Sequence, residues 1–592
     1  MELVNIKINN MPVQIEEGKT ILDAAKSIGL KIPTLCYLKD VNESGACRVC
    51  LVEVKGAKNL VTSCCYPVRE GLEVQTNTKR VLNGRRNSVE LLMSNHSKDC
   101  LSCLKNQNCE LQELCQTVGV RENAFVGSMT TPHFDDVAPG IVIDTTKCVL
   151  CGRCIETCNK VQGLGILGFS NRGFETVVGP VYGLSMDDVN CMQCGQCVNA
   201  CPTGALSEKE NIHDVIKALN DPSKHVVVQT APAVRASLGE EFGMPIGSRV
   251  TGKMVSALKA IGFNRVYDTN YGADLTIMEE GTEFIDRVSN KGVLPMITSC
   301  SPGWVRYLEF EYPELIPHLS SCKSPHMMVG ALLKTYYPQA KGLDPRDIYV
   351  VSVMPCTAKK AEILRDEMVE NGVHDVDAVI TTRELGRLIK MYGLDFPNLK
   401  DSEFDHDMFG EYSGAGVIFG ATGGVMEAAL RTVTEILEGK SFDEVNYEVC
   451  RGKEGVKHAE LDIAGINVRV AIASGMTNAK PLLEEIKAGK SPYHFIEIMG
   501  CPGGCINGGG QSIIKADIRN GFTNIDWITE RSKALYEEDA SLPVRKSHEN
   551  VQIKQLYNNF LEKPGSHISH EILHTHYYAR NRMNYISEEE DK

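Results

Sequence analysis

Cysteine is the residue type that dominates the candidate chemistry of this chain. The sequence contains 23 cysteines, and seventeen of them lie before residue 202. We expect a cytoplasmic protein, because the N-terminus lacks a basic start followed by an apolar stretch, and because no apolar run reaches the roughly eighteen residues that would span a membrane. Thiols stay reduced in that compartment, so metal ligation explains the cysteines better than disulfide bonds.

The strongest local pattern is an internal repeat of two cysteine runs. Both runs have the spacing Cys-x2-Cys-x2-Cys-x3-Cys, and the second ends in Cys-Pro, which is typical of ferredoxins that hold two 4Fe–4S clusters. In such ferredoxins the fourth cysteine of each run ligates the other cluster. The predicted ligands are therefore Cys148, Cys151, Cys154 and Cys201 for one cluster, and Cys158, Cys191, Cys194 and Cys197 for the other.

Four earlier cysteines suit a 2Fe–2S cluster. Two short alternating strands and a helix starting near Thr20 are expected before them. Ten residues separate the first two cysteines, which departs from the plant-type spacing, and a zinc site is the alternative. Cys65 is expected to be a bystander beside the last ligand. The predicted ligands are Cys36, Cys47, Cys50 and Cys64.

A mixed histidine and cysteine set follows, and its spacing alone suits zinc or a 4Fe–4S cluster equally. Its cluster-rich neighbourhood favours iron–sulfur, because an isolated zinc ion would carry no electrons between clusters. One 2Fe–2S and three 4Fe–4S clusters would form a chain for electrons, with a partner at one end and chemistry at the other. The ligands of this set are His96, Cys100, Cys103 and Cys109.

The chain after residue 222 reads as α/β. Four apolar runs, at 225–230, 292–298, 348–354 and 494–499, are predicted to be buried and parallel strands. Open α/β sheets place ligands beyond the carboxyl ends of their strands. Three of these runs end in loops that contain cysteine, so the loops are expected to converge on one cofactor. The cysteines concerned are Cys300, Cys356, Cys501 and Cys505.

The loops MPCTAKKAE and MGCPGGCINGGGQ closely resemble the second and third active-site signatures of iron-only hydrogenases, and TSCSPGW resembles the first. The resemblance extends over nearly the whole chain and is greatest to the catalytic subunit of NAD(P)-linked, electron-bifurcating forms. It implies an α/β core of two doubly wound lobes, preceded by α+β ferredoxin-like iron–sulfur domains. It also implies the H-cluster, a 4Fe–4S cubane joined by a thiolate to a two-iron subsite with CO and cyanide ligands.

The resemblance also implies domain boundaries. We expect a 2Fe–2S domain at 1–78, a domain with one histidine and three cysteine ligands at 79–125 and a two-cluster ferredoxin domain at 138–210. The H-cluster core is expected at 220–515. A helical segment resembling the small subunit of these enzymes is expected at 516–592, and HTHYYARNR within it is expected to be an ordinary amphipathic helix.

Roles for individual residues follow from the same resemblance. Cys356, Cys501 and Cys505 would ligate the cubane, with Cys505 bridging to the two-iron subsite. Met354 and Met499 would pack against that subsite. The residues expected to contact the cyanides are Ala231, Pro232 and Lys359, and those expected to form a proton path are Cys300, Glu280, Ser320, Glu283 and Arg287.

One departure from the family pattern concerns the first loop. Ser301 stands where a second cysteine is usual, so either Cys300 supplies the cubane ligand, or Ser301 ligates through oxygen, or the cubane has only three cysteines. His326 stands where glutamine is common. The departure at Ser301 motivates an alternative function, a redox or H2 sensor or an electron-transfer subunit with an altered cluster. A third candidate is a cluster-assembly factor of the Narf type, which shares this core. Proteins of that type lack the long chain of clusters predicted here, which argues against this candidate.

The expected reaction is reversible H2 oxidation and proton reduction. The net charge of −14 argues against nucleic acid as a partner, since phosphate binding requires a basic patch. No G-x-G-x-x-G fingerprint occurs in a βαβ context, so NAD(P) or flavin chemistry would belong to another subunit. The expected partners are H2 and protons, together with a flavin- and NAD(P)-binding diaphorase subunit and a small 2Fe–2S subunit, or a ferredoxin.

Overall fold

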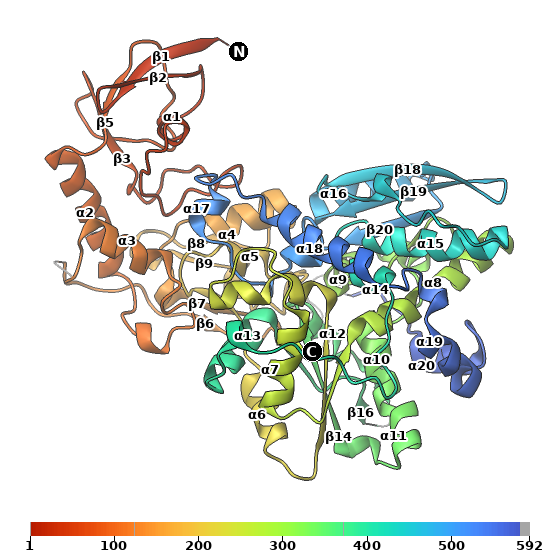
Figure 1. The fold of residues 1–592 in the computed structure, drawn as a ribbon. Helices are drawn as coiled ribbons and strands as arrows, with labels where there is room; N and C mark the ends of the chain where they lie inside the picture. Colours follow the sequence, from red (N-terminus) through yellow and green to blue (C-terminus); the bar gives the residue numbers. More distant parts are fainter. Residues whose placement is uncertain (1, 123–124, 371, 581–592) are drawn as a thin grey trace, which may run out of the picture. The chain divides into compact units, whose positions relative to one another are not determined.

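The computed structural model describes residues 2–122, 125–370 and 372–580. The chain forms two compact units, which we call the N-terminal unit and the core unit (Figure 1). The predicted segment 516–592 is divided between them. The N-terminal unit comprises Met1–Val189, Gln196–Ser207 and Ile513–Asp526, and the core unit comprises Asn190–Gly195, Glu208–Ser512 and Trp527–Lys592.

The N-terminal unit begins with a five-stranded sheet in the order β2-β1-β5-β3-β4. Alternate residues of β1 are buried, as the apolar alternation predicts for a sheet with one face on a core. Helix α1 starts after Thr20, whose side chain and that of Asp23 form a capping box. The elements are β1 (Leu3–Ile8), β2 (Met11–Glu16), α1 (Ile21–Ser27), β3 (Leu51–Val54), β4 (Val61–Thr62) and β5 (Glu73–Gln75).

Helices form much of the part of this unit that contains its other cysteines. Helix α2 begins at a Thr78 cap, and α3 ends at Gly119, which takes a left-handed conformation. The short helices α4 and α5 begin at equivalent positions of the two cysteine runs, one residue before the third cysteine of each run. The elements are α2 (Lys79–Ser94), α3 (Glu110–Val118), β6 (Phe134–Asp135), β7 (Ile141–Asp144), α4 (Arg153–Glu156) and α5 (Gln196–Ala200).

The core unit contains two four-stranded sheets. The first has the order β12-β11-β14-β17, and its strands are all parallel. Strand β12 lies on one side of β11, and β14 lies on the other side. The order of the strands therefore reverses at β11, which creates a topological switch point at the carboxyl ends of β11 and β14. Its strands are β11 (His225–Thr230), β12 (Arg265–Asp268), β14 (Ile348–Met354) and β17 (Ala378–Thr381).

The second sheet has the order β13-β20-β19-β18, with an antiparallel strand only at the β18 edge. The four apolar runs of the sequence therefore form parallel strands as predicted, but they are shared between the two sheets. This two-lobed α/β core confirms the predicted fold class. The strands are β13 (Met296–Ile297), β18 (Val456–Ile463), β19 (Ile466–Ser474) and β20 (Phe495–Met499).

Helices bury the faces of both sheets. Helix α8 contacts helices α10, α14 and α15, and its first half is buried continuously. Among the described residues, no helix is long and apolar enough to cross a membrane. The helices of this unit include α7 (Thr251–Ile261), α8 (Thr269–Ser289), α9 (Pro302–Glu311), α10 (Pro325–Lys334), α12 (Lys359–Glu362), α13 (Thr382–Met391), α14 (Gly414–Ile418), α15 (Gly424–Glu438) and α16 (Met476–Lys487).

The end of the chain packs on the core as short helices, α18 (Trp527–Ser541), α19 (Val551–Leu556) and α20 (His567–Leu573). The prediction of a helix for HTHYYARNR is wrong for its described part, because α20 ends at Leu573 and residues 574–580 are not helical. Instead, His574 forms a β-bridge with Cys322. Backbone pairing with a distant segment thus replaces the local helical bonds that the sequence pattern suggested.

Candidate functional site

A cavity in the core unit gathers residues from loops that are far apart in the sequence. Its volume is about 90 Å³, several times the space that one water molecule requires. The lining is mostly apolar, and it lies at the carboxyl ends of strands from both sheets. Every residue expected to hold the two-iron cofactor lines it, namely Ala231, Pro232, Cys300, Ser301, Met354, Cys356, Lys359, Met499, Cys501 and Cys505.

Glycine allows the second and third loops to approach one another. A Cβ on Gly508 would lie 2.1 Å from the carbonyl oxygen of Pro355, which no side chain could tolerate. Gly504 has a φ of +95°, a conformation that other residues rarely adopt. The glycine-rich sequence after β20 therefore serves to bring Cys505 beside the loop of Cys356.

The thiols of this cavity are poorly placed to ionise without a bound cation. Burial raises the pKa of Cys505 to about 12 and also raises the pKa of Cys356. Burial, followed by the charge of Glu280, raises the pKa of Cys300 well above its usual value. Metal ions supply the positive charge that stabilises buried thiolates. The donor set therefore fits an iron–sulfur cofactor.

Lys359 is anchored beside these thiols. Its Nζ lies 2.8 Å from Glu362 Oε2 and donates to the carbonyl oxygen of Cys300 at 3.1 Å. The same Glu362 oxygen lies 2.7 Å from His326 Nε2. Although burial alone would raise the pKa of Glu362, the Lys359 charge and His326 lower it to about 2. Sequence reasoning missed Glu362, although its position three residues after Lys359 was an available signal for a helical ion pair.

His326, the second departure from the family pattern, is held as a neutral ring. Burial, followed by the nearby Lys359 charge, lowers its pKa to about 4. Its Nδ1 lies 3.2 Å from Ser352 Oγ. The imidazole therefore acts as a hydrogen-bonding side chain between Ser352 and Glu362, which a glutamine amide could also do.

Ser301 follows Cys300 in the first active-site loop and immediately precedes helix α9. Its Oγ accepts a hydrogen bond from the backbone N–H of Gly500 at 3.1 Å, next to the predicted ligand Cys501. Ser301 and Cys300 both line the cavity. Both candidates for the cubane's fourth protein ligand therefore lie at the same cavity.

The predicted proton path lies along one face of helix α8. Glu280 is 1% exposed, so the solvated helix face that the local sequence suggests is not formed here. Burial, followed by the charge of Glu283, raises the pKa of Glu280 to about 8. Ser320 Oγ donates to Glu283 Oε2 at 3.0 Å, and Arg287 Nη2 lies 2.6 Å from Glu283 Oε1. Neither carboxylate oxygen of Glu280 has a hydrogen-bond partner among the described residues, so its link to the Ser320–Glu283 pair stays a prediction.

The first cysteine set forms two close pairs in the N-terminal unit. Cys50 Sγ lies 3.3 Å from Cys64 Sγ, and the Cys36 N–H donates to Cys47 Sγ at 3.4 Å. All four residues are buried, whereas Cys65 is exposed. Hydrogen bonds from Cys47 and Cys64 lower the pKa values of their partners. Two thiol pairs, each with one readily ionised member, fit a 2Fe–2S cluster.

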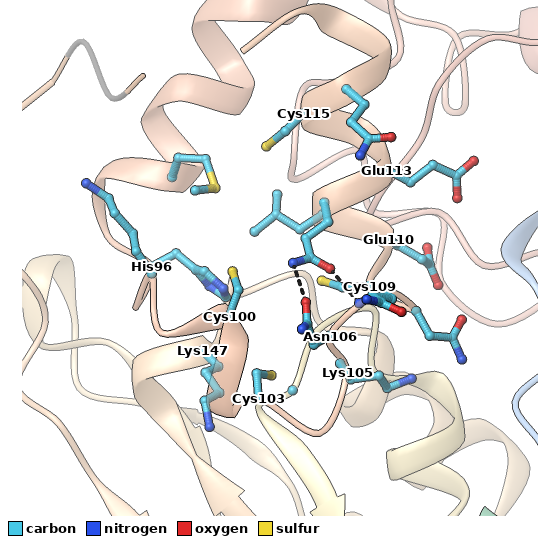
Figure 2. Close-up of a pocket in the computed structure, with 18 of the residues that line it drawn as sticks. His96, Cys100, Cys103, Lys105, Asn106, Cys109, Glu110, Glu113, Cys115 and Lys147 are labelled. Carbon is cyan, nitrogen blue, oxygen red and sulfur yellow. Dashed lines mark hydrogen bonds between the residues drawn. The ribbon is translucent and has the colours of Figure 1, made fainter. Parts of the chain in front are cut away.

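The histidine and cysteine set lines a cavity of about 1030 Å³ in the same unit (Figure 2). In Figure 2 the side chains of His96, Cys100, Cys103 and Cys109 surround one space, whereas Cys115 lies apart. Burial, followed by the charge of Lys147, lowers the pKa of His96 and keeps the ring neutral. Its Nδ1 is buried with no hydrogen-bond partner among the described residues, which fits a metal ligand.

The two cysteine runs repeat in backbone geometry as well as in sequence. Leu150 and Gln193 have φ values of 50° and 53°, and Gly152 and Gly195 have 77° and 70°. The N–H groups of Leu150 and Gln193 donate to the first sulfur of their own runs at 3.4 and 3.3 Å. These turns direct backbone donors at sulfur, as an anionic cluster requires.

One crossed ligand set is brought together around a small cavity of the N-terminal unit, whose lining includes Cys148, Cys151, Cys154 and Cys201. For the other set, Cys158 and Cys197 belong to the N-terminal unit and Cys191 and Cys194 to the core unit. That second set stays a prediction.

We expect His96→Ala to remove about four irons per chain, because the cluster would lose one of its four protein ligands. Iron analysis together with EPR of the reduced protein would test this loss. Cys115→Ala is the matched control, since this residue lines the same cavity but lies apart from the other sulfurs. Unchanged iron content and spectra in the His96 variant would contradict its assignment as a ligand.

Comparisons with known proteins agree with these features. The model "Iron only hydrogenase large subunit, C-terminal domain" matches residues 224–509, and "Iron hydrogenase small subunit" matches 525–580. Three iron–sulfur models match the preceding part of the chain. They are a 2Fe–2S cluster binding domain at 1–79, the iron–sulfur binding region of the NADH-ubiquinone oxidoreductase G subunit at 85–124 and a 4Fe–4S dicluster domain at 147–205.

Curated relatives match over almost their whole length. The NADP-reducing hydrogenase subunit HndD of Solidesulfovibrio fructosivorans is 47% identical over 98% of this chain and 100% of its own. Iron hydrogenase 1 of Clostridium pasteurianum is 43% identical over 97% of this chain and 99% of its own. A solved structure of the [FeFe]-hydrogenase HydA1 from Chlamydomonas reinhardtii is 40% identical, covers 62% of this chain and 98% of that chain, and has a TM-score of 0.55. The chain therefore belongs to the iron-only hydrogenases, oxidoreductases that act on H2, and it carries iron–sulfur cluster domains before the hydrogenase core.

Proposed function

We propose that this chain catalyses reversible H2 oxidation and proton reduction at an H-cluster in the core cavity. One observation carries the proposal: three distant loops bring Cys300, Cys356, Cys501 and Cys505 to the same cavity as Lys359. A set of thiols around a mostly apolar cavity, with one adjacent cation, suits a cofactor that combines an iron–sulfur cubane with anionic ligands.

Cys356, Cys501 and Cys505 would hold the cubane, with Cys505 as the bridging thiolate. When bound, the H-cluster supplies the metal centre at which the H–H bond is broken or formed. Lys359, held by Glu362, would donate to a cyanide ligand. Ala231 and Pro232 would line the cyanide sites, and Met354 and Met499 would keep the subsite apolar and exclude water.

Protons would move between the cavity and solvent through the chain's own side chains. Cys300 would hold a proton next to the cofactor, since its raised pKa favours the thiol. Glu280, whose pKa of about 8 allows it both to gain and to lose a proton near neutral pH, would exchange that proton with Ser320 and Glu283. Arg287 would hold the Glu283 carboxylate in place.

Electrons would pass through one 2Fe–2S and three 4Fe–4S clusters of the iron–sulfur domains. Because a relative of the full length is an NADP-reducing hydrogenase subunit, we propose partners that bind flavin and NAD(P), together with a small 2Fe–2S subunit, or else a ferredoxin. We propose the cytoplasm as the location, because cysteines that ligate clusters must stay reduced.

The test is H2 uptake and evolution by protein matured with the two-iron subsite, together with infrared and EPR spectroscopy. We expect CO and cyanide bands, a cluster count that matches the predicted ligand sets, and turnover in both directions. The Ser301 departure favours one second candidate, a sensor or electron-transfer subunit. CO and cyanide bands without detectable turnover would support that candidate and contradict the enzyme proposal.

We expect Ser301→Cys to change the reduction potential of the cubane if Ser301 occupies the ligand position, because alkoxide oxygen and thiolate sulfur stabilise the oxidation states of iron differently. Redox titration followed by EPR would measure the shift. Ser301→Ala is the matched control, since it removes the oxygen and the bond to the Gly500 N–H. Identical potentials in the parent and both variants would show that Ser301 is not a ligand.

A further inference from the structure

The solvent side of the proposed proton path has two branches at Glu283. On one side, Arg287 binds Glu283 Oε1 through Nη2 at 2.6 Å and Nε at 3.1 Å. Its remaining donors bind the carbonyl oxygens of Val293, Pro317, His318 and Leu319. A guanidinium stays protonated in proteins, so it can neutralise Glu283 but cannot accept a proton from it.

On the other side, Ser321 connects Glu283 to a histidine. The Ser321 N–H donates to Glu283 Oε2 at 3.0 Å, and its Oγ donates to the same oxygen at 3.2 Å. That Oγ also lies 2.8 Å from His574 Nδ1. A hydroxyl can accept one proton while it releases another, and an imidazole nitrogen can either accept or donate a proton. This branch can therefore carry a proton where Arg287 cannot.

Glu279 orients the His574 ring through Nε2, whereas Ser321 contacts Nδ1. Its Oε2 lies 3.1 Å from His574 Nε2, while Tyr557 and the Gly565 N–H hold the carboxylate. Although burial alone would raise the pKa of Glu279, hydrogen bonds from His574, Ser569 and Tyr557 lower it. The anionic Glu279 keeps a proton on Nε2 and leaves Nδ1 to exchange protons with Ser321.

The surface end of this branch is formed by helix α20. His570 is exposed, and its ring centroid lies 4.1 Å from that of His574. His574 itself is only 8% exposed. Besides Glu279 and Glu283, the ionisable groups that face His574 are Cys322, whose Sγ lies 4.0 Å from Nδ1, and Tyr557 behind Glu279. The exposed histidine thus covers the buried one.

We propose that protons pass between Glu283 and solvent through Ser321, His574 and His570 of the C-terminal segment, with Arg287 as an anchor and not a relay. In the outward direction, Glu283 gives its proton to Ser321 Oγ while the Ser321 hydroxyl proton moves to His574 Nδ1. The resulting imidazolium carries a proton on each ring nitrogen, and it returns to neutral when the Nδ1 proton passes to solvent at the partly exposed edge of the ring beside His570. The inward direction reverses these transfers. The inference rests on the proposed hydrogenase function.

The test compares the full, matured protein with the variants His574→Gln and Ser321→Ala. We expect both to lower H2 evolution roughly 10- to 100-fold, to increase the solvent deuterium isotope effect and to leave the infrared bands unchanged. Folding should survive, because the backbone bonds Lys323 N to Leu573 O and Thr575 N to Ser321 O hold the segment without these side chains. His567→Ala is the control, since this residue lies on the same helix and is 86% exposed.

His570→Ala should lose several-fold in rate and regain it when free imidazole is added, because imidazole can occupy the exposed position. Arg287→Lys, which keeps the positive charge beside Glu283, should lose less than Ser321→Ala. Parent-like rates and isotope effects in both the His574 and Ser321 variants would overturn the proposal, and so would the reverse ranking of the Arg287 and Ser321 variants. Turnover and CO and cyanide bands in the parent test the hydrogenase function separately.

Discussion

Glu280→Gln is expected to lower H2 evolution and uptake by roughly 100- to 10,000-fold, the usual contribution of a positioned proton donor. Glutamine keeps the shape of the side chain but cannot exchange a proton at neutral pH. Glu280 is buried, its charge acts on Cys300, and its pKa of about 8 suits a group that is repeatedly protonated and deprotonated.

Initial rates with an artificial electron donor would measure this loss, and infrared spectra would confirm that the cofactor is present. Glu314→Gln is a matched control, because Glu314 pairs at the surface with Lys487. Wild-type rates in the Glu280 variant would show that protons reach Cys300 by a route that does not include this carboxyl group.

The same carboxyl group should affect stability in a way that depends on pH. Burial raises its pKa from 4.5 to about 8, so the folded state retains a proton that the unfolded state loses between these values. The contribution of Glu280 to the free energy of unfolding therefore falls as pH rises from about 4.5 to about 8. We expect Glu280→Gln to unfold at a higher temperature than the parent at pH 8 and to differ little from it below pH 4.5. A difference that is the same at every pH would contradict the raised pKa.

Cys505→Ala should abolish H2 turnover completely and eliminate the CO and cyanide bands. Cys505 is the proposed bridge between cubane and two-iron subsite, so its loss removes the attachment of the reacting metals and not merely one hydrogen bond. Infrared spectroscopy of protein matured in parallel with the parent would measure the effect directly.

Cys450→Ala is the control for the loss of a buried thiol. Cys450 is fully buried in the hydrophobic cluster of the second sheet and does not line the cavity. Its substitution should cost on the order of 1 kcal/mol of stability and leave the bands unchanged. Bands and turnover that persisted in the Cys505 variant would require another residue to attach the subsite.

The sequence by itself determined the parts of this protein that depend on short spacings. The spacing of the two cysteine runs predicted a repeated cluster-binding segment, and the repeat recurs in the backbone as matching positive φ values at Leu150 and Gln193. The continuous apolar runs predicted buried parallel strands, since both faces of such strands are covered by helices. The family that the three active-site loops suggested was confirmed by full-length relatives.

Only the tertiary structure decided which distant residues meet and which are buried. The acidic segment IMEEGTE around Glu280 looks like a solvated helix face, and only packing against other segments excludes water from it. HTHYYARNR looks helical locally, yet backbone pairing with Cys322 holds His574 beside Ser321 and Glu279. Spacing along the chain fixes ligands that share a turn, whereas burial and long-range pairing depend on contacts hundreds of residues apart, which no local pattern contains.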